Sequence, residues 1–293
     1  MFKDQGTIGN RHLMAASRWL YRLFVIVILA SQPCQATDHT ANTDNYIFGV
    51  FPYLSAVRLE NIYAPVAASL QQATGGQIYF RTASQFKRFF GRLKQQHYDI
   101  ALIQPFWYVP SVDQFGYLPL ARMKEPFTSL IMVPDDSPLQ TLEDLRGKVI
   151  ATPPAFVPVV HMARKALKER GLIPGKDLEL RAFKSVDSCF QQVLIGNADA
   201  CVSPPFAPAV VEEKMHVRLR VILKTPAIPN LTFIVHQRVP EPMREQLRQT
   251  ILSWHTSREG QQLLQGMKTQ GFVPALEEDY AGVRELVKEA KKQ

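Results

Sequence analysis

The chain has 293 residues, of which 46% are hydrophobic and 20% charged, and its formal net charge is +8. This is enough material to bury a sizeable core, and the length suggests about two domains. The basic residues are scattered, with no run of five or more, which excludes the clustered Lys/Arg footprint typical of nucleic-acid binding.

The N-terminus has the pattern of a secretory signal peptide. A basic leader precedes the apolar run 23–30, and Cys34-Gln35-Ala36 provides a small-x-small cleavage site. An eight-residue apolar run is too short to span a bilayer. We therefore predict a signal peptide over 1–36, a polar leader over 37–43 and a periplasmic mature protein. The alternatives are an uncleaved anchor from Trp19 and lipidation at Cys34, although SQPC lacks the small residue expected before a lipidated cysteine.

The first part of the mature chain alternates strands with helices. We predict a strand in 46–56 that ends through Gly49 and Pro52, a helix over 59–75 and a strand over 77–83. A helix within 84–99 with Ser84 as its N-cap and a strand over 99–104 follow. The order β-α-β-α-β indicates a parallel α/β sheet with right-handed crossovers.

The pattern then runs a second time. Strands are predicted in 126–137, 177–183, 198–203, 217–225 and 232–237, and a short capped helix followed by a strand in 141–152. Helices are predicted over 157–171 and 185–199, with helical structure from about Pro240. The expected fold is α/β with two lobes, each a mostly parallel sheet flanked by helices. Residues 44–133 and 234–293 would form lobe 1, and residues 134–233 would form lobe 2.

The two halves share one local pattern. A Pro-Phe pair lies six and seven residues after Asp99, and another lies at the same distance after Asp199. The pairs are Pro105-Phe106 and Pro205-Phe206. Both would follow the carboxyl ends of strands, where open α/β sheets bind ligands. The alternative is that each proline merely stops a strand and each phenylalanine packs locally.

Five segments, in order, carry a family resemblance: FGVFPYLS, YDIALIQPFWYV, TLEDLRGKVIAT, GNADA and TPAIPN. With their spacing and the leader, they make the mature region similar to periplasmic solute-binding proteins of the phosphate, phosphite and phosphonate (PhnD-like) type. The resemblance implies a type II binding-protein fold that closes like a hinge on a small ligand between its lobes. It also implies an ABC permease in the inner membrane as partner, a monomeric protein and no cofactor.

The residues expected to contact a ligand depart from that family. Its members carry a Ser-Thr-Ser-Gly run at the start of a helix, where this chain has TPPAFVPVV over 152–160. The prolines remove backbone N–H donors that would meet an anion there. Where members of the family carry a histidine and an acid, this chain has Val186 and Phe206. These changes favour an aromatic cleft for a ligand with an apolar body or for a weakly hydrated anion.

The candidate ligand contacts are the aromatic and polar residues near the predicted strand ends. They are Phe51, Tyr53, Ser55, Phe86, Gln104, Phe106, Tyr108, Thr152, Phe156, His161, Ser203 and Phe206. For the polar members the alternative is helix capping or turn chemistry, and a lone histidine is more often structural.

The sequence contains little evidence for a metal site or for catalysis. Cys189 and Cys201 either form a disulfide or are two small buried hydrophobic residues, and with His161 they make only a weak metal signature, so no metal site is predicted. No nucleophile elbow, P-loop, glycine-rich dinucleotide turn or His-Glu metal motif is present, so we expect a binding protein and not an enzyme.

Two functions are compatible with these features. The first is solute delivery to an ABC importer. The alternative is periplasmic ligand sensing with a histidine kinase, because PFWYV is also similar to sensor domains that detect oxyanions. A thiol at Cys201 would extend that alternative to metalloids.

Overall fold

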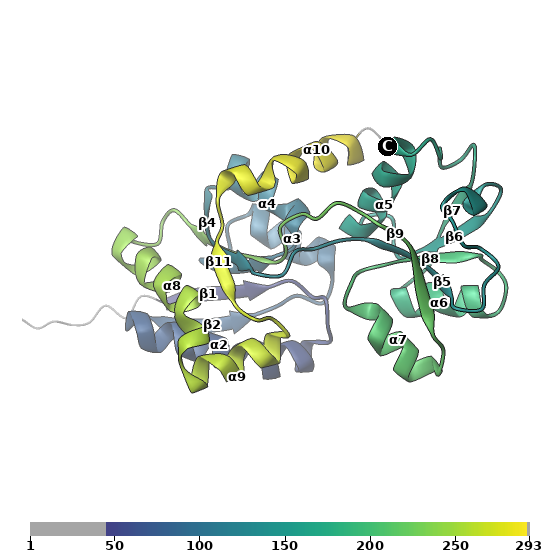
Figure 1. Ribbon diagram of the computed structural model, residues 1–293. Coiled ribbons are helices and arrows are strands. Elements are labelled where there is room, and N and C mark those ends of the chain that lie inside the picture. The colour runs from purple at the N-terminus through teal and green to yellow at the C-terminus, as the bar shows by residue number, and fades with distance from the viewer. Residues whose placement is uncertain (1–44, 292–293) are drawn as a thin grey trace, which may run out of the picture. The chain divides into compact units, whose positions relative to one another are not determined.

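The computed structural model describes residues 45–291, which form two mixed β-sheets with helices packed against them (Figure 1). The predicted signal peptide and polar leader lie outside the described residues. Among residues 45–291, no helix combines the length and apolar character needed to cross a bilayer.

The first sheet has the strand order β11-β4-β10-β3-β1-β2. Its strands are β1 (Asn45–Val50), β2 (Gln77–Arg81), β3 (Ile100–Ile103), β4 (Tyr117–Met123), β10 (Thr232–His236) and β11 (Phe272–Pro274). Strand β1 runs parallel to both β2 and β3, while β10, β4 and β11 continue the sheet with antiparallel pairing. The parallel part is the β-α-β-α-β unit expected from the sequence.

The second sheet has the order β7-β6-β8-β5-β9. Its strands are β5 (Leu130–Pro134), β6 (Val149–Thr152), β7 (Glu179–Ala182), β8 (Ala200–Ser203) and β9 (Leu219–Lys224). Strand β6 runs parallel to β7 and β8, and β5 lies antiparallel between β8 and β9. The two sheets thus share one design, in which three parallel strands are extended by further strands through antiparallel pairing.

The helices separate into layers. They are α2 (Ala56–Thr74), α3 (Phe86–Lys94), α4 (Pro105–Gln114), α5 (Pro158–Glu169), α6 (Val186–Leu194), α7 (Ala207–Met215), α8 (Glu241–Ser253), α9 (Arg258–Met267) and α10 (Ala281–Ala290), with short 3₁₀ turns η1 (Glu143–Leu145), η2 (Trp254–Thr256) and η3 (Glu277–Tyr280). Helices α2, α8 and α9 cover one face of the first sheet, and α3, α4 and α10 cover the other (Figure 1). Helices α5 and α6 cover opposite faces of the second sheet.

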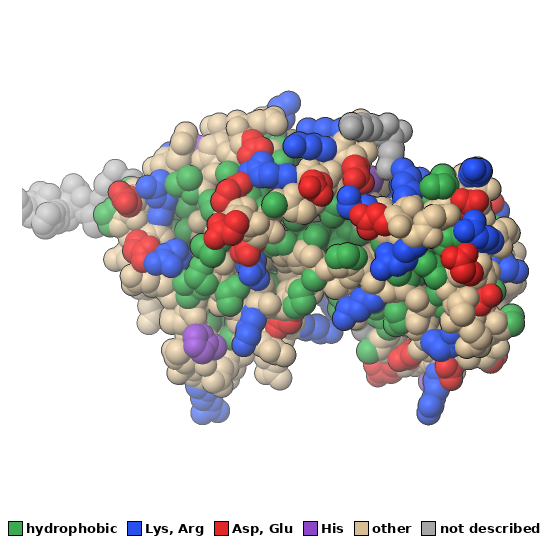
Figure 2. Space-filling view, turned by 45° about the horizontal axis from the view of Figure 1, so that its top comes forward, with side chains coloured by type: hydrophobic (Ala, Val, Ile, Leu, Met, Phe, Trp, Pro, Cys, Tyr) green, Lys and Arg blue, Asp and Glu red, His purple; other side chains and the backbone are tan. Residues whose placement is uncertain are grey.

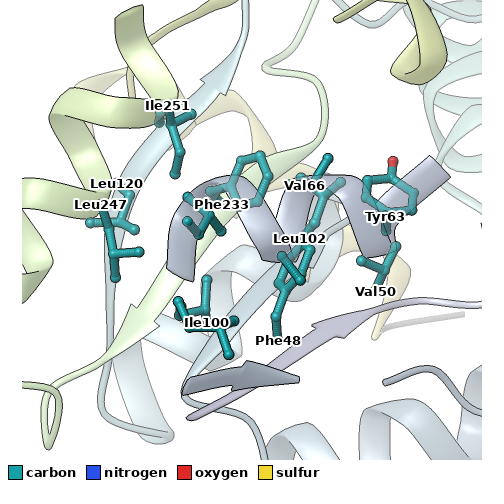
Figure 3. Close-up of a cluster of buried hydrophobic side chains, with 14 of the residues drawn as sticks. Phe48, Val50, Tyr63, Val66, Ile100, Leu102, Leu120, Phe233, Leu247 and Ile251 are labelled. Atoms are coloured by element: carbon teal, nitrogen blue, oxygen red, sulfur yellow. The ribbon is translucent and has the colours of Figure 1, made fainter. Parts of the chain in front are cut away.

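Period-two alternation explains this layering. In β1, Phe48 and Val50 point into the core beneath α2, whereas Ile47 packs on the opposite side with α3 and α4. Figure 3 shows Phe48 and Val50 among aliphatic and aromatic side chains from β3, β10, α2 and α8. With both faces covered, the strands need nearly continuous hydrophobic sequence, as in Ile100–Ile103.

Two chain segments connect the sheets and pair with each other. Phe127 and Ile228 form an antiparallel bridge with reciprocal backbone hydrogen bonds of 2.9 Å. The backbone N–H of Ser129 donates to the Thr225 hydroxyl at 2.9 Å. Phe127 packs against core residues of both sheets. The connection is therefore a short two-stranded ribbon.

The structure corrects several details of the predicted elements. Residues 130–133, expected in the first lobe, form part of β5 in the second sheet, because an apolar run does not reveal which sheet it joins. Helix α3 is capped at Gln85 and not at Ser84, and it ends at Lys94, just before Gln96 takes a φ of 61°. The Pro-Phe pairs follow strand ends as expected, but they also stand at the starts of two helices that the sequence patterns did not indicate. Pro105 is the first residue of α4, and Phe206 immediately precedes α7.

Candidate functional site

The strand ends of each sheet place the predicted contact residues in groups. Val50 pairs with Leu102, so β1 and β3 end at the same edge, followed by Phe51 and by Gln104. In the second sheet, Ala151 pairs with Cys201, so Thr152 and Ser203 end neighbouring parallel strands. These carboxyl ends are the edge where ligands bind in open α/β sheets.

The start of α4 fixes the orientation of Phe106. Gln104 is the N-cap, and its Oε1 accepts a hydrogen bond from the backbone N–H of Phe106 at 3.0 Å. Pro105 suits the first helical position, because its N–H would have no helical partner there and its φ is already close to the helical value. The glutamine predicted as a ligand contact is thus used by the backbone.

Aromatic rings gather around the ends of β1 and β3. The Phe51 ring centroid lies 5.0 Å from that of Tyr53, 6.0 Å from that of Phe86 and 5.9 Å from that of Trp107. Phe51 is buried and the other three are half-buried. The hydroxyls of Tyr53 and Tyr63 lie 2.8 Å apart, and burial raises the pKa of both groups. The group forms an apolar wall with one hydroxyl pair at its side.

Two ring contacts join this wall to the residues that follow β6. The Phe86 centroid lies 5.7 Å from that of Phe156, and the Phe106 centroid lies 5.4 Å from that of His161. We call these four residues the aromatic junction. It brings together side chains from α3, α4 and α5 and from the segment before α5, although the pairs are separated by at least 55 residues in sequence.

His161 contributes to the junction as a mostly neutral ring at pH 7. Burial lowers the pKa of His161 below its usual 6.5, and the neighbouring positive charge of Arg164 lowers it further. A neutral imidazole offers one hydrogen-bond donor and one acceptor next to the Phe106 ring. It provides polarity at the junction without a fixed positive charge.

Two predicted aromatic residues of the second sheet are open to solvent. Phe156 is 58% exposed and Phe206 is 68% exposed, although both follow buried strands. Large apolar side chains on a monomer surface are informative when they stand beside other apolar groups. Phe156 does so through Phe86, whereas Phe206 precedes α7 and shares the β8 end with Ser203.

Other predicted residues lie elsewhere or serve the fold. Tyr108 is fully buried, its ring stacks on Tyr280 with centroids 3.4 Å apart, and its hydroxyl donates to Glu277 Oε2 at 2.8 Å. It therefore faces α10 and not the aromatic junction. Ser55 is exposed and caps α2.

The hydroxyl-bearing residues at the strand ends are hidden from solvent. Thr152 is 1% exposed and Ser203 is fully buried. The Ser203 hydroxyl donates to the carbonyl of Pro204 at 3.0 Å. In this arrangement neither side chain is accessible to solvent at the edge of the sheet.

An ion pair between α5 and α10 also joins the helices of the two sheets, and the sequence did not predict it. Lys165 of α5 donates to Glu289 of α10 at 2.8 Å, and it also lies 4.0 Å from Glu285. The partners are 124 residues apart, and no local motif marks such a pair. Trp107, which belongs to the aromatic run PFWYV but not to the twelve candidate contacts, packs against the rings of Phe51, Phe86, Phe89 and Phe90.

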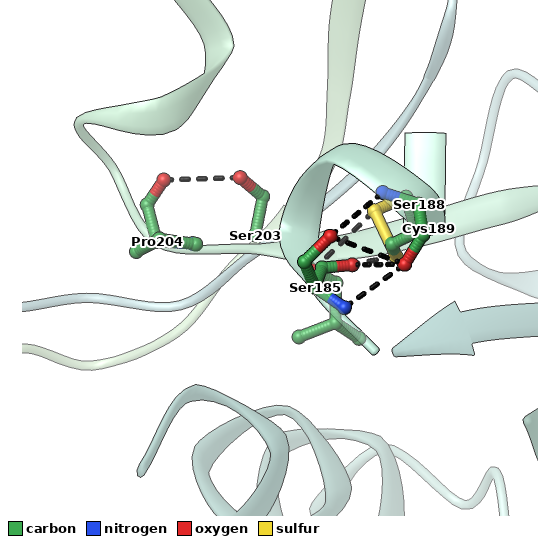
Figure 4. Close-up of a disulfide and its surroundings, with 7 residues drawn as sticks. Ser185, Ser188, Cys189, Ser203 and Pro204 are labelled. Carbon is green, nitrogen blue, oxygen red and sulfur yellow. Dashed lines mark hydrogen bonds between the residues drawn. A yellow bond between two sulfur atoms is a disulfide. The ribbon is translucent and has the colours of Figure 1, made fainter. Parts of the chain in front are cut away.

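Cys189 and Cys201 form a disulfide, which settles the pairing that the sequence left open. It links α6 to β8, two residues before Ser203 (Figure 4). Both cysteines are fully buried. A metalloid site that uses a free Cys201 thiol is therefore excluded in this oxidised form, because the sulfur is already bonded.

The charged residues form a mixed surface. On the face shown in Figure 2, Lys and Arg side chains alternate with Asp and Glu, with hydrophobic side chains between them. Among the described residues, no group of three or more His, Cys, Asp or Glu side chains is placed to hold a metal ion.

Comparisons with known proteins agree with this architecture. The sequence profile of the family described as "ABC transporter, phosphonate, periplasmic substrate-binding protein" matches residues 48–280. No match to an individually curated protein was found.

Several solved structures have a similar fold. A binding-protein component of an ABC phosphonate transporter from Pseudomonas aeruginosa has a TM-score of 0.69 at 17% identity, over 86% of this chain and 88% of that one. PhnD1 from Prochlorococcus marinus, in complex with methylphosphonate, has a TM-score of 0.69 at 14% identity, over 86% and 100%. The aliphatic sulphonate binding protein SsuA from Escherichia coli has a TM-score of 0.62 at 13% identity, over 85% and 92%.

These similarities confirm the predicted two-lobed type II binding-protein fold. Neither the profile nor the structures support the alternative of a sensor acting with a histidine kinase. The profile match spans most of the chain and includes the strand ends of both sheets. The chain belongs to the family of phosphonate-type periplasmic substrate-binding proteins of ABC transporters.

Proposed function

We propose that this protein captures a small organic anion with an apolar group at the aromatic junction and delivers it to an inner-membrane ABC permease. One observation carries the proposal: the residues presented at the strand ends are aromatic, whereas the hydroxyls there are buried. An apolar wall with few polar groups suits a ligand whose body is largely apolar.

A bare phosphonate group finds few donors in the segment before α5. Helix α5 begins at Pro158, which has no N–H, and its N-cap Val157 makes no side-chain capping bond. Pro153 and Pro154 remove two more donors. Binding of a strongly hydrated anion requires such donors to replace its water. A ligand that gains free energy from ring contacts depends on them less.

Capture would use the ribbon of Phe127 and Ile228 as the hinge between the lobes. We place the lobes along the sheets, with residues 45–123 and 232–291 in the first and 130–224 in the second. A ligand that contacts both Phe86 and Phe156 binds the closed arrangement more tightly than an open one, and this difference in affinity drives closure.

The remaining parts of the proposal come from the sequence and the family. Residues 1–36 would direct export and be removed after Ala36, and the mature protein would act as a monomer without turnover of its ligand. Its periplasmic location follows from the family. The permease would receive the ligand when the lobes reopen.

A matched ligand series tests the ligand class. Phosphate, methylphosphonate, phenylphosphonate and benzenesulfonate are compared by thermal shift, in which binding to the folded state raises the melting temperature. The phenyl compounds should stabilise the protein more than methylphosphonate does. If phosphate or methylphosphonate stabilises it as much as phenylphosphonate, the aromatic site is not what selects the ligand.

Variants locate the site. Removing the ring in Phe156→Ala or Phe86→Ala should weaken binding of the best phenyl compound roughly tenfold, because both rings belong to the junction and burying an aromatic side chain contributes about 1.5–3 kcal/mol. Tyr108→Phe is the matched control, since Tyr108 faces Tyr280 and Glu277. Unchanged affinity in both alanine variants, or a loss in the control, would contradict the assignment.

A further inference from the structure

A second cavity lies away from the strand ends, among α3, α4 and α10. Its volume is about 260 Å³. Its lining residues are Phe90, Lys94, Val109, Pro110, Gln114, Phe115, Val287 and Lys291. None of them belongs to the aromatic junction or to the predicted ligand contacts.

The inner wall of the cavity is apolar and held by ring packing. The Phe90 centroid lies 5.9 Å from that of Phe115 and 5.2 Å from that of Trp107. Phe115 is 6% exposed and Val287 is 9% exposed. These side chains already pack against the core of the first sheet, so the wall is formed in advance of any ligand.

Helix α4 lines one side of the cavity. Pro110 lies inside α4 and cannot donate a helical hydrogen bond, and its ring lines the cavity beside Val109. Val109 and Val287 are short side chains where α4 and α10 approach, and they leave a void that a larger residue would fill.

The rim of the cavity carries two positively charged lysines. Lys94 ends α3 and Lys291 caps α10, and both side chains are exposed. Among the described residues, the ion pairs involve other basic groups and neither of these lysines. The sequence from Asn61 to Tyr98 contains no acidic residue, so α3 does not supply one.

We propose that this cavity is a second ligand site, which takes a small aromatic carboxylate. Its ring would lie against Phe90, Phe115 and Val287, and its carboxylate would lie between the ammonium groups of Lys94 and Lys291. An apolar cavity of roughly 150 Å³ holds benzene, so a volume of about 260 Å³ accommodates a ring with a carboxylate. Two cations at the rim select an anion over a neutral or cationic molecule of equal shape.

The position of the site gives it a route to the lobe contacts. Helix α3 carries Phe86, which contacts Phe156, and α4 carries Phe106, which contacts His161. Helix α10 carries Glu289, which binds Lys165. Every wall of the cavity therefore belongs to a helix that also touches the second lobe. The proposal does not depend on the ligand class assigned to the aromatic junction.

Three probes of similar shape test the site: benzoate, benzamide and benzamidinium, titrated into the purified protein by calorimetry. Benzoate should bind saturably. The affinity for benzamide should be at least roughly tenfold lower, because benzamide lacks the charge that the lysines pair with. Absence of saturable benzoate binding, or equal binding of all three probes, would overturn the proposal.

Variants then separate this cavity from the aromatic junction. Lys94→Gln combined with Lys291→Gln should weaken benzoate binding roughly tenfold. Lys87→Gln on the same helix, outside the cavity, is the matched control. Val109→Phe should remove the lysine-dependent benzoate binding by filling the space. Phe156→Ala weakens any binding of benzoate at the aromatic junction, so the lysine-dependent binding is also measured in that background, where it should persist. If Phe156→Ala removes benzoate binding and Lys94→Gln with Lys291→Gln does not, benzoate binds at the junction and the second site is wrong.

Discussion

Asp99 and Ile47 hold each other at two points across the first sheet. The backbone N–H of Ile47 donates to Asp99 Oδ2 at 2.7 Å, and the backbone N–H of Asp99 donates to the Ile47 carbonyl at 2.9 Å. Asp199 and Val149 repeat this arrangement in the second sheet, with both distances at 2.8 Å. The shared sequence pattern around the two aspartates thus has a structural cause, because each one ties its strand to the neighbouring parallel strand.

Replacing either aspartate should therefore affect stability. Asp99→Ala should lower the free energy of unfolding by about 2–3 kcal/mol, since it leaves a backbone N–H and the Arg238 guanidinium without their acceptor. Asp199→Ala should cost about 1–2 kcal/mol, because its side chain is 35% exposed against 11% for Asp99. Urea denaturation measures both. Asp187→Ala, which removes an exposed pair with Lys214, is the control and should cost less than about 1 kcal/mol.

Gly49 leaves space for a buried ring. A Cβ at this position would lie 2.5 Å from Cδ1 of Tyr98, which is 1% exposed and cannot swing into solvent. Gly49→Ala should therefore lower the free energy of unfolding by about 1–3 kcal/mol through overpacking. Thermal or urea unfolding tests this, and a variant as stable as the parent would show that Tyr98 can move.

Gly91 offers the opposite case within α3. A Cβ added there meets no atom within 4 Å. Gly91→Ala should raise the free energy of unfolding by about 0.5–1 kcal/mol, because alanine loses less backbone entropy in a helix interior than glycine does. The pair of glycine variants separates steric cost from backbone propensity in one assay.

The disulfide should contribute substantially to stability. Cys189 and Cys201 are 12 residues apart, and a closed loop of this size stabilises by roughly 3 kcal/mol through the unfolded state. Cys189→Ala combined with Cys201→Ala should lower the free energy of unfolding by about 2–3 kcal/mol. Thiol titration of protein lacking residues 1–36, and therefore Cys34, should find no reactive thiol before reduction. A free thiol in the oxidised protein would contradict the pairing.

Stability should fall as the pH decreases, partly through His161. Its pKa in the folded protein is below the usual 6.5, so the unfolded chain binds the proton more readily. The contribution of the neutral ring to the free energy of unfolding is fully present above pH 6.5, and it is lost as the pH falls through the pKa of His161 in the folded protein. Between about pH 7.5 and about pH 5.5, the melting temperature of His161→Gln should therefore fall by less than that of the parent protein.

His97→Gln, at an exposed position, is the control for that measurement. Some pH dependence should persist in His161→Gln, because burial and Arg238 also lower the pKa of His236. Identical pH profiles of the parent and His161→Gln would show that His161 is not linked to folding.

Much of the fold follows from local sequence. Alternation in β1 and the run Ile100–Ile103 mark strands with two covered faces, and the order of elements indicates parallel units. Helix α4 was missed because Pro105 and Pro110 both suggest interruption, although the first is favourable at the start of a helix. Strand β5 was given to the wrong sheet, since a short apolar strand does not reveal its long-range partners.

The candidate site was harder to predict. Proximity to a strand end grouped Phe86, Phe106, Phe156 and His161 with Tyr108, yet little more than half a helical turn separates a residue of α4 that faces the junction from one that faces α10. Tyr108 is two residues after Phe106, so it points in a different direction around the helix. Polar residues such as Gln104 and Ser203 were chosen for their chemistry, but nearby backbone groups use that chemistry first.

The ribbon between the sheets has a consequence for how the chain is divided into parts. Its bond from Ser129 to Thr225 joins residues 96 positions apart, so the whole second sheet is an insertion whose two ends meet. A segment with adjacent ends resembles a domain inserted into a host loop, which chains tolerate well. Residues 128–226, produced alone, should therefore retain their own sheet, and the first sheet should accept a short linker in their place.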